Sequence, residues 1–152
     1  MSRAFVTEPD TDETGTDLPD RVISPEPNYV TPEGFAKIEA ELTRVKAEQA
    51  SAHGESPDLP HIARDLRYWQ ARRASAQVIE PIKNPDHVQF GTTVTIRRDG
   101  RKQTFKIVGE DEADPSAGTL SYVAPLARAL MGKEIGDAVK VGDDNAEIID
   151  IR

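Results

Sequence analysis

The sequence predicts an α+β protein, in which a short antiparallel helical hairpin precedes a small, mostly antiparallel β-sheet domain with one short helix. Two apolar stripes at helical spacing lie within residues 30–80 and are joined by a turn rich in proline and glycine. Short alternating runs, separated by turn residues, fill residues 81–152. A single apolar run introduced by Pro125 supplies the helix of this second domain.

Length and composition exclude several classes of protein. A chain of 152 residues forms one medium domain or two small ones. Cysteine is absent, so disulfides and thiolate metal sites are excluded. No apolar run is long enough to span a membrane, and the N-terminus lacks the apolar core of a signal peptide. We therefore expect a cytoplasmic protein without a membrane partner.

The charge is unevenly distributed along the chain. Of the net charge of −8, residues 1–30 carry −5, residues 31–79 are neutral and residues 80–152 carry −3. This balance argues against non-specific binding to nucleic-acid phosphates. We also expect no direct sequence-specific contact with nucleic acid. Residues 1–29 are acidic and poor in apolar side chains, so they cannot bury enough surface to offset their ordering entropy. We predict a disordered acidic tail over residues 1–29.

The first helix of the hairpin begins after Thr31, whose hydroxyl can cap free N–H groups. Pro32 suits the first turn, and Glu33 complements the helix dipole. Apolar residues then recur at spacings of 3, 4 and 3, which is typical of the a/d seam of a coiled coil. The residues of this stripe are Phe35, Ile38, Leu42 and Val45.

A second helix follows the turn at residues 54–60. Its stripe of Ile62, Leu66 and Trp69 repeats at spacings of 4 and 3, and Arg73 interrupts it. Two striped helices joined by a short turn form an antiparallel hairpin, predicted here over residues 30–80. We expect a monomer, although seams of this kind also pair between chains, so a dimer stays open.

The domain at residues 81–152 contains the predicted strands. Asp99-Gly100 lies between two strand-like runs and indicates a hairpin turn. The other predicted elements are strands at 88–90, 92–96 and 105–109, an exposed acidic loop at 110–118, a strand at 120–123, a helix at 125–131 and a final hairpin over 139–151.

Several of these segments resemble the C-terminal domain of the GreA/GreB transcript-cleavage factors. The segments IVGEDEADP at 107–115 and APLARALMGKEIGD at 124–137 occur in the order found in that family, and EIIDI fits its final strand. Ala124 stands where the family usually has serine. The opening MSRAFV and the later PNYVTPEG resemble a Gre-like subgroup with an N-terminal acidic arm. The resemblance implies that residues 81–152 adopt an FKBP-like fold.

The resemblance also implies a mechanism and a partner, RNA polymerase. In Gre factors the globular domain docks at the entrance of the polymerase secondary channel, and acidic residues at the hairpin tip help to hold a second Mg²⁺ at the polymerase active centre. The protein is therefore not expected to be an enzyme. We expect no metal or cofactor of its own, and any Mg²⁺ is shared with the polymerase.

The hairpin tip departs from the family. The usual tip word is close to GDLSENAEY, whereas here Glu55 and Asp58 are surrounded by prolines. Residues 31–79 number 49, about two dozen fewer than in the family, and at about 1.5 Å per residue over two helices this removes roughly 18 Å of reach. A metal ligand must lie about 2 Å from Mg²⁺. Glu55 and Asp58 are thus weak candidates for tip carboxylates.

These observations predict a Gre-like elongation regulator that binds RNA polymerase through its C-terminal domain, with transcript cleavage disfavoured by the short hairpin. One alternative is a true cleavage-stimulating factor that uses Glu55 and Asp58. Another is an acidic protein-interaction adaptor that does not act on RNA polymerase. The resemblance places polymerase docking on the acidic loop and the start of the short helix, at Asp111, Glu112, Asp114, Ala124, Pro125, Leu126 and Arg128.

Overall fold

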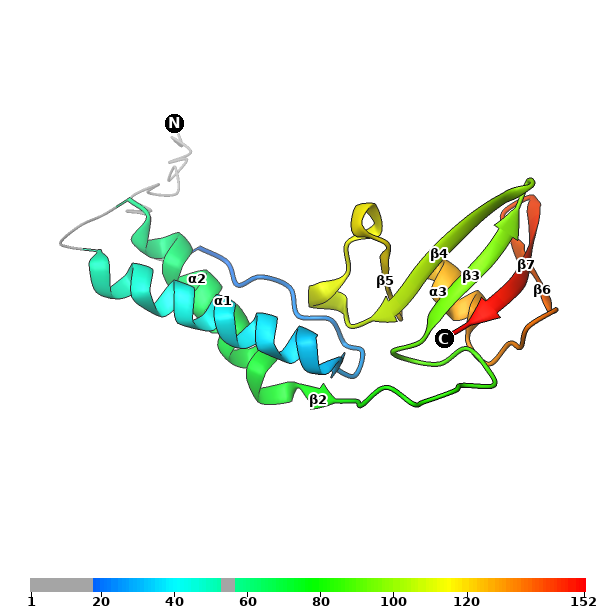
Figure 1. Cartoon of the computed structure of the whole chain (residues 1–152). Coiled ribbons are helices and arrows are strands. Elements are labelled where there is room, and N and C mark those ends of the chain that lie inside the picture. The colour runs from blue at the N-terminus through cyan, green and yellow to red at the C-terminus, as the bar shows by residue number, and fades with distance from the viewer. Residues whose placement is uncertain (1–17, 53–56) are drawn as a thin grey trace, which may run out of the picture.

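A computed structural model describes residues 18–52 and 57–152. It consists of a pair of helices and a five-stranded sheet that lie end to end, with the strands β1 and β2 between them (Figure 1). Helix α1 spans Pro32–Ser51 and helix α2 spans Leu59–Ser75. The two helices run antiparallel and pack along their length (Figure 1). No helix in these described ranges is long and apolar enough to cross a membrane.

The predicted stripes form the contact between the helices. Ile38, Leu42 and Val45 on α1 are buried. Helix α2 packs against α1, and its stripe residues Leu66 and Trp69 are half-buried. The start of α1 is the predicted one, because the Thr31 hydroxyl accepts a hydrogen bond from the Gly34 N–H at 3.0 Å.

The chain enters and leaves the helical pair through two short parallel strands. Strand β1 spans Tyr29–Val30 and strand β2 spans Gln77–Val78, with Tyr29 opposite Gln77 in the register. Backbone hydrogen bonds from Gln77 to Asn28 (2.8 Å) and from Ile79 to Val30 (2.9 Å) close this pair. The two ends of the hairpin are therefore tied together where it meets the rest of the protein.

The five-stranded sheet has the order β5-β4-β3-β7-β6. All neighbours pair antiparallel except β4 and β5, which are parallel. Asp99 and Gly100 both have positive φ in the β3–β4 turn, as the sequence predicts. The strands are β3 (Thr93–Arg98), β4 (Arg101–Val108), β5 (Thr119–Ser121), β6 (Ala138–Val141) and β7 (Asp144–Ile151).

Helix α3, Pro125–Leu130, covers one face of the sheet. Its Ala127 and Leu130 are fully buried against sheet residues such as Ile96, Ile107 and Ile148. The alternation of β3 is typical of a half-buried strand, since Val94 and Ile96 are buried and their neighbours are not.

Three segments differ from the sequence-based expectations. Residues 88–90 are not a strand, because Val88 exchanges its backbone hydrogen bonds with Gly132 and Lys133 after α3. The acidic loop 110–118 contains two 3₁₀ turns, η1 (Glu110–Glu112) and η2 (Pro115–Ala117), and η1 is half-buried rather than exposed. Of the tail predicted over residues 1–29, residues 1–17 lie outside the described residues, and residues 18–28 extend along the helical pair (Figure 1).

Candidate functional site

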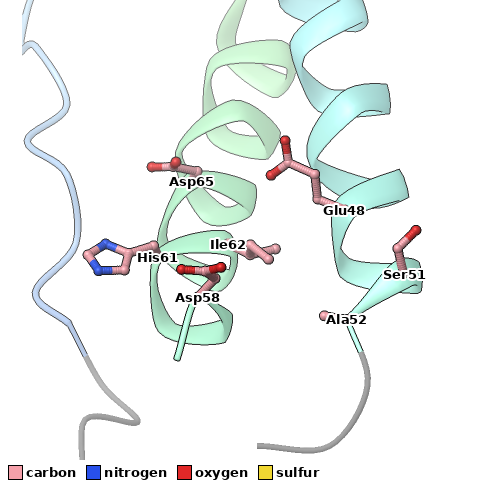
Figure 2. A pocket seen from close by; sticks show the side chains of 7 residues that line it. All are labelled: Glu48, Ser51, Ala52, Asp58, His61, Ile62 and Asp65. Carbon is pink, nitrogen blue, oxygen red and sulfur yellow. The ribbon is translucent and has the colours of Figure 1, made fainter. Parts of the chain in front are cut away.

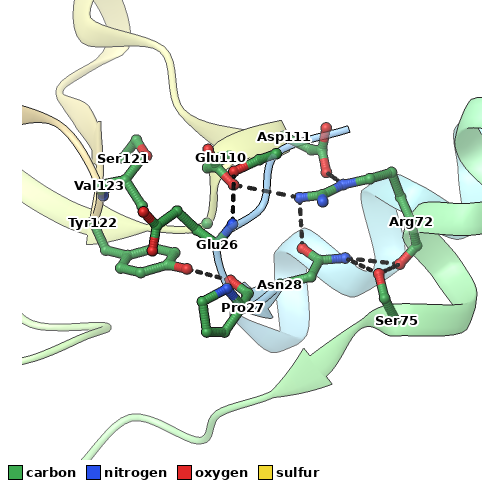
Figure 3. A network of polar contacts seen from close by, with 12 residues as sticks. Glu26, Pro27, Asn28, Arg72, Ser75, Glu110, Asp111, Ser121, Tyr122 and Val123 are labelled. Atoms are coloured by element: carbon green, nitrogen blue, oxygen red, sulfur yellow. Dashed lines mark hydrogen bonds and ion pairs between the residues drawn. The ribbon is translucent and has the colours of Figure 1, made fainter. Parts of the chain in front are cut away.

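The helical pair and the sheet domain meet at a buried polar cluster, shown in Figure 3. At its centre the Arg72 guanidinium, 2% exposed, donates from Nε to Asp111 Oδ2 at 2.5 Å and from a terminal nitrogen to Asn28 Oδ1 at 2.7 Å. Glu110 Oε2 lies 3.8 Å from the same guanidinium and is buried without a hydrogen-bond partner in the part of the chain that the structure describes. We call Asn28, Tyr68, Arg72, Glu110 and Asp111 the junction cluster.

The junction cluster joins three separate parts of the chain. Asn28 comes from the segment before β1, and its side-chain amide donates to the Arg72 carbonyl at 2.8 Å, which fixes the end of α2. The Tyr68 hydroxyl, one helical turn before Arg72, donates to the second oxygen of Asp111. Because both Asp111 oxygens are engaged by α2, the cluster holds the helical pair in one orientation relative to the sheet.

The Tyr68 side chain reports on the integrity of this cluster. Burial raises the pKa of Tyr68 to about 12, and the hydrogen bond to Asp111 together with the Asp111 charge adds to the effect. The fold thus favours the protonated phenol. Since the folded pKa lies above the unfolded value, this contribution to stability is complete below about pH 10 and is lost as the pH rises toward 12.

We therefore expect the free energy of unfolding of the wild type to fall more steeply between pH 9.5 and 11 than that of Tyr68→Phe. Urea unfolding at a series of pH values measures this difference. Tyr29→Phe is the control, because Tyr29 lies nearby in the aromatic cluster with Phe90 and Tyr122. Equal slopes for the wild type and Tyr68→Phe would show that Tyr68 keeps an ordinary pKa.

A second contact between the two parts is made by Glu112. Its carboxylate accepts hydrogen bonds from the Thr31 N–H at 3.0 Å, the Thr31 hydroxyl at 2.5 Å and the Gly109 N–H at 3.2 Å. A Cβ on Gly34 would lie 2.0 Å from this carboxylate. Gly34, in the first turn of α1, is therefore needed for close approach rather than for its backbone freedom.

The residues predicted to dock a partner divide into two groups. Asp111 and Glu112 are bound within the chain, as described above, and so do not form an open acidic surface. Asp114 is exposed, and the hydrogen bond from the Ser116 hydroxyl, 2.5 Å, lowers the Asp114 pKa. Pro125 is exposed at the start of α3, next to the half-buried Leu126.

The remaining docking candidates lie beside these residues. Ala124 is the half-buried residue that precedes α3. The exposed Arg128 donates to the Val123 carbonyl at 2.9 Å and pairs with Glu26 at 3.1 Å. Asp114, Ala124, Pro125, Leu126 and Arg128 therefore remain as the predicted docking surface, which we call the α3 surface.

The tip of the helical pair carries the other predicted site, shown in Figure 2. Glu55 lies outside the described residues, and Asp58 is exposed at the start of α2. In the described part of the chain, no group of three or more acidic or histidine side chains converges to hold a metal ion. The open hollow at this end is lined by Glu48, Ser51, Ala52, Asp58, His61, Ile62 and Asp65.

The sequence of the sheet domain matches a known protein family. A model of the C-terminal domain of transcription elongation factors GreA/GreB matches residues 83–152, the sheet domain. Transcription elongation factor GreA of Legionella pneumophila (strain Lens) is 39% identical over 136 residues, covering 74% of this chain and 85% of that protein. The chain belongs to the GreA/GreB family. This confirms the family predicted from the sequence.

Other Gre-family relatives agree with this assignment. Transcription elongation factor GreA of Cereibacter sphaeroides (strain ATCC 17023) is 33% identical over 149 residues, covering 81% of this chain and 99% of that protein. Among solved structures, GreA factor homolog 1 (Gfh1) of Thermus thermophilus is 14% identical with a TM-score of 0.41, covering 84% of this chain and 99% of that one. At that TM-score the structural likeness adds nothing to the assignment.

The junction cluster is the part of this Gre-family protein that sequence reasoning missed. Arg73 interrupts the apolar stripe in the sequence, yet Arg73 is exposed and its neighbour Arg72 is buried. The signal was present in the carboxylates of the acidic loop, which follow a buried strand and so start close to the core. Their partner on α2 is 39 residues away in sequence, and no spacing rule links the two.

Proposed function

We propose that this Gre-family protein regulates transcription elongation by binding bacterial RNA polymerase at the secondary channel through its sheet domain, while its helical hairpin is too short to support transcript cleavage. The protein is then a polymerase-binding regulator of the cytoplasm and not an enzyme. It holds no metal of its own and acts as a monomer. The FKBP-like assignment of the sheet domain is part of this proposal, supported by its five strands and the covering helix α3.

The length of the hairpin is the observation that carries this proposal. Helix α1 has 20 residues, which corresponds to about 30 Å. The match to the Legionella protein spans 136 residues but only 74% of this 152-residue chain, which is about 112 residues. About two dozen residues of that relative therefore have no counterpart here. Shared over two helices, they amount to roughly 18 Å of reach.

Such a deficit disfavours cleavage and leaves docking unaffected. A ligand to Mg²⁺ must lie about 2 Å from the ion, so a tip that falls short by several helical turns cannot supply one. Asp58 is the N-cap residue of α2 at this tip, so its carboxylate would also lie too far from the ion to bind it. The sheet domain keeps the sequence motifs shared with the GreA/GreB family, so we expect binding to the polymerase to persist without cleavage.

The test of this proposal is a transcript-cleavage assay on stalled, backtracked polymerase complexes. We expect no release of short 3′ RNA fragments by this protein, and slower release by an authentic Gre factor when this protein is added as competitor. Rapid release of fragments that is lost in Asp58→Asn would favour the alternative of a true cleavage factor. Fragment release with no competition would contradict both parts of the proposal.

The α3 surface supplies a second prediction. The double substitution Asp114→Arg, Pro125→Glu is expected to weaken polymerase pull-down at least tenfold, because it changes the charge of an exposed surface without touching the buried core. Circular dichroism should remain unchanged.

The control for this surface is Asp143→Arg, Ala138→Glu. It makes the same changes of charge at exposed positions on β6 and its turn. We expect the control to bind the polymerase like the wild type. Equal binding by both double variants would place the contact elsewhere, as expected for an adaptor that acts through its acidic N-terminal residues.

A further inference from the structure

The described residues before β1 form a strap that connects the two parts of the protein. Residues 18–28, which we call the strap, run along the helical pair toward the sheet domain (Figure 1). Asp20 pairs with Arg67 of α2 at 2.5 Å, and the Arg21 guanidinium lies 3.8 Å from the centre of the Tyr68 ring. The strap is thus anchored on α2 before it reaches the sheet domain.

The far end of the strap contacts the segment that carries the α3 surface. The Tyr122 hydroxyl donates a hydrogen bond to the Pro27 carbonyl (Figure 3). One residue earlier, the Glu26 carboxylate pairs with a terminal nitrogen of Arg128 at 3.1 Å, while Arg128 Nε donates to the Val123 carbonyl at 2.9 Å. The cation of the α3 surface is therefore already engaged within the chain.

The sequence around Glu26 favours a fixed position for its carboxylate. Glu26 lies between Pro25 and Pro27, and each proline has a fixed φ and restricts the residue before it to extended backbone. The Glu26 N–H donates to the Ser24 hydroxyl at 3.2 Å, and Asn28, two residues later, is buried in the junction cluster. Because the backbone is held on both sides of Glu26, little backbone entropy is lost when its carboxylate forms an ion pair.

A partner that approaches the α3 surface meets Arg128 with its charge already balanced. The Arg128 side chain is 60% exposed, so a partner can reach it, but an acidic group of that partner would also be repelled by the Glu26 carboxylate. Such a group gains less from Arg128 than it would from a free guanidinium. Since the strap belongs to the same chain, Glu26 competes at a high effective concentration, whatever the concentration of the protein.

We propose that Glu26 is a built-in competitor that lowers the affinity of the α3 surface for RNA polymerase. This inference rests on the proposed function, because it takes the α3 surface as the docking site. The group that Glu26 replaces is an acidic side chain of the polymerase that faces Arg128. Both the Glu26–Arg128 pair and the Tyr122–Pro27 hydrogen bond lie at the surface, so the polymerase can displace this end of the strap without opening the junction cluster.

The experiment compares the affinity of variants of the full chain for RNA polymerase. An exposed ion pair changes an equilibrium by up to about fivefold, so Glu26→Gln should bind about two to five times more tightly than the wild type. The gain should shrink as salt is added, because ions screen exposed charges. In the Arg128→Gln background, Glu26→Gln should give no gain. Circular dichroism should stay unchanged, because both side chains lie at the surface.

The matched control is Glu80→Gln, which removes the same charge at an exposed position after β2. We expect this control to bind the polymerase like the wild type. An equal gain in both variants would attribute the effect to net charge, and weaker binding by Glu26→Gln would make the strap part of the docking surface. Either result would overturn the proposal.

The double variant Asp114→Arg, Pro125→Glu separates a failure of this inference from a failure of the proposed function. If that variant binds like the wild type, or if the wild type does not bind, the α3 surface is not the docking site and both proposals fail. If that variant loses binding but Glu26→Gln binds like the wild type, only the role of the strap is wrong.

Discussion

Replacing Arg72 with methionine is expected to lower the free energy of unfolding by about 3–5 kcal/mol, the usual result of removing one partner of a buried ion pair. The side chain of Arg72 is 2% exposed and that of Asp111 is 9% exposed, so water cannot replace the lost guanidinium. The carboxylates of Glu110 and Asp111 would be left near each other without a counter-charge, and Asn28 Oδ1 would lose its donor. Urea unfolding followed by circular dichroism measures the change.

Arg73→Met is the matched control for this substitution. Arg73 is the next residue of α2 and is exposed, and its replacement removes the same charge. We therefore expect the free energy of unfolding to change by no more than about 0.5 kcal/mol. A similar small loss in both variants would mean that the junction cluster contributes little to stability. The helical pair would then be free to change its orientation relative to the sheet.

Gly34→Ala is expected to destabilise the protein by about 1–3 kcal/mol, against the usual preference of helices for alanine. The added Cβ would lie 2.0 Å from a Glu112 oxygen. A free glutamate side chain would move away at little cost, but this carboxylate accepts three hydrogen bonds from Thr31 and Gly109. The substitution therefore displaces Glu112 and leaves those donors without their acceptor.

The double variant Gly34→Ala, Glu112→Ala separates this explanation from a simple helix effect. Without the Glu112 side chain the Cβ has room, so in the Glu112→Ala background the Gly34→Ala change should be stabilising by up to about 1 kcal/mol. A double-mutant cycle from urea unfolding gives the coupling free energy of the two positions. A coupling near zero would show that Glu112 does not restrict Gly34.

Much of the fold could be predicted from residue patterns because the patterns act locally. The Thr31 cap, the stripe of α1 and the Asp99-Gly100 turn are each decided within a few residues, and the structure has all three. The prediction of a strand at 88–90 is wrong because the hydrogen-bond partners of this segment are distant in sequence. Val88 is buried and apolar, but its backbone partners follow α3, more than forty residues later.

The candidate site was predictable only in part. The motifs shared with the family predict docking at the α3 surface, where Pro125 and Asp114 are exposed. The same motifs placed Asp111 and Glu112 on that surface, whereas both carboxylates are bound to the helical pair. Sequence similarity predicts where a whole segment lies in the fold. It does not predict which side chains of an acidic loop point toward the interior.

The sequence by itself determined the family, the order of the two long helices and the β3–β4 hairpin, because each of these depends on local patterns. Only the tertiary structure decided how the two parts are joined. Arg72 lies 44 residues after Asn28 and 39 residues before Asp111, and the contact of the three depends on the path of the backbone between them. A buried charge needs a partner within hydrogen-bonding distance, and that distance is fixed when the parts pack together.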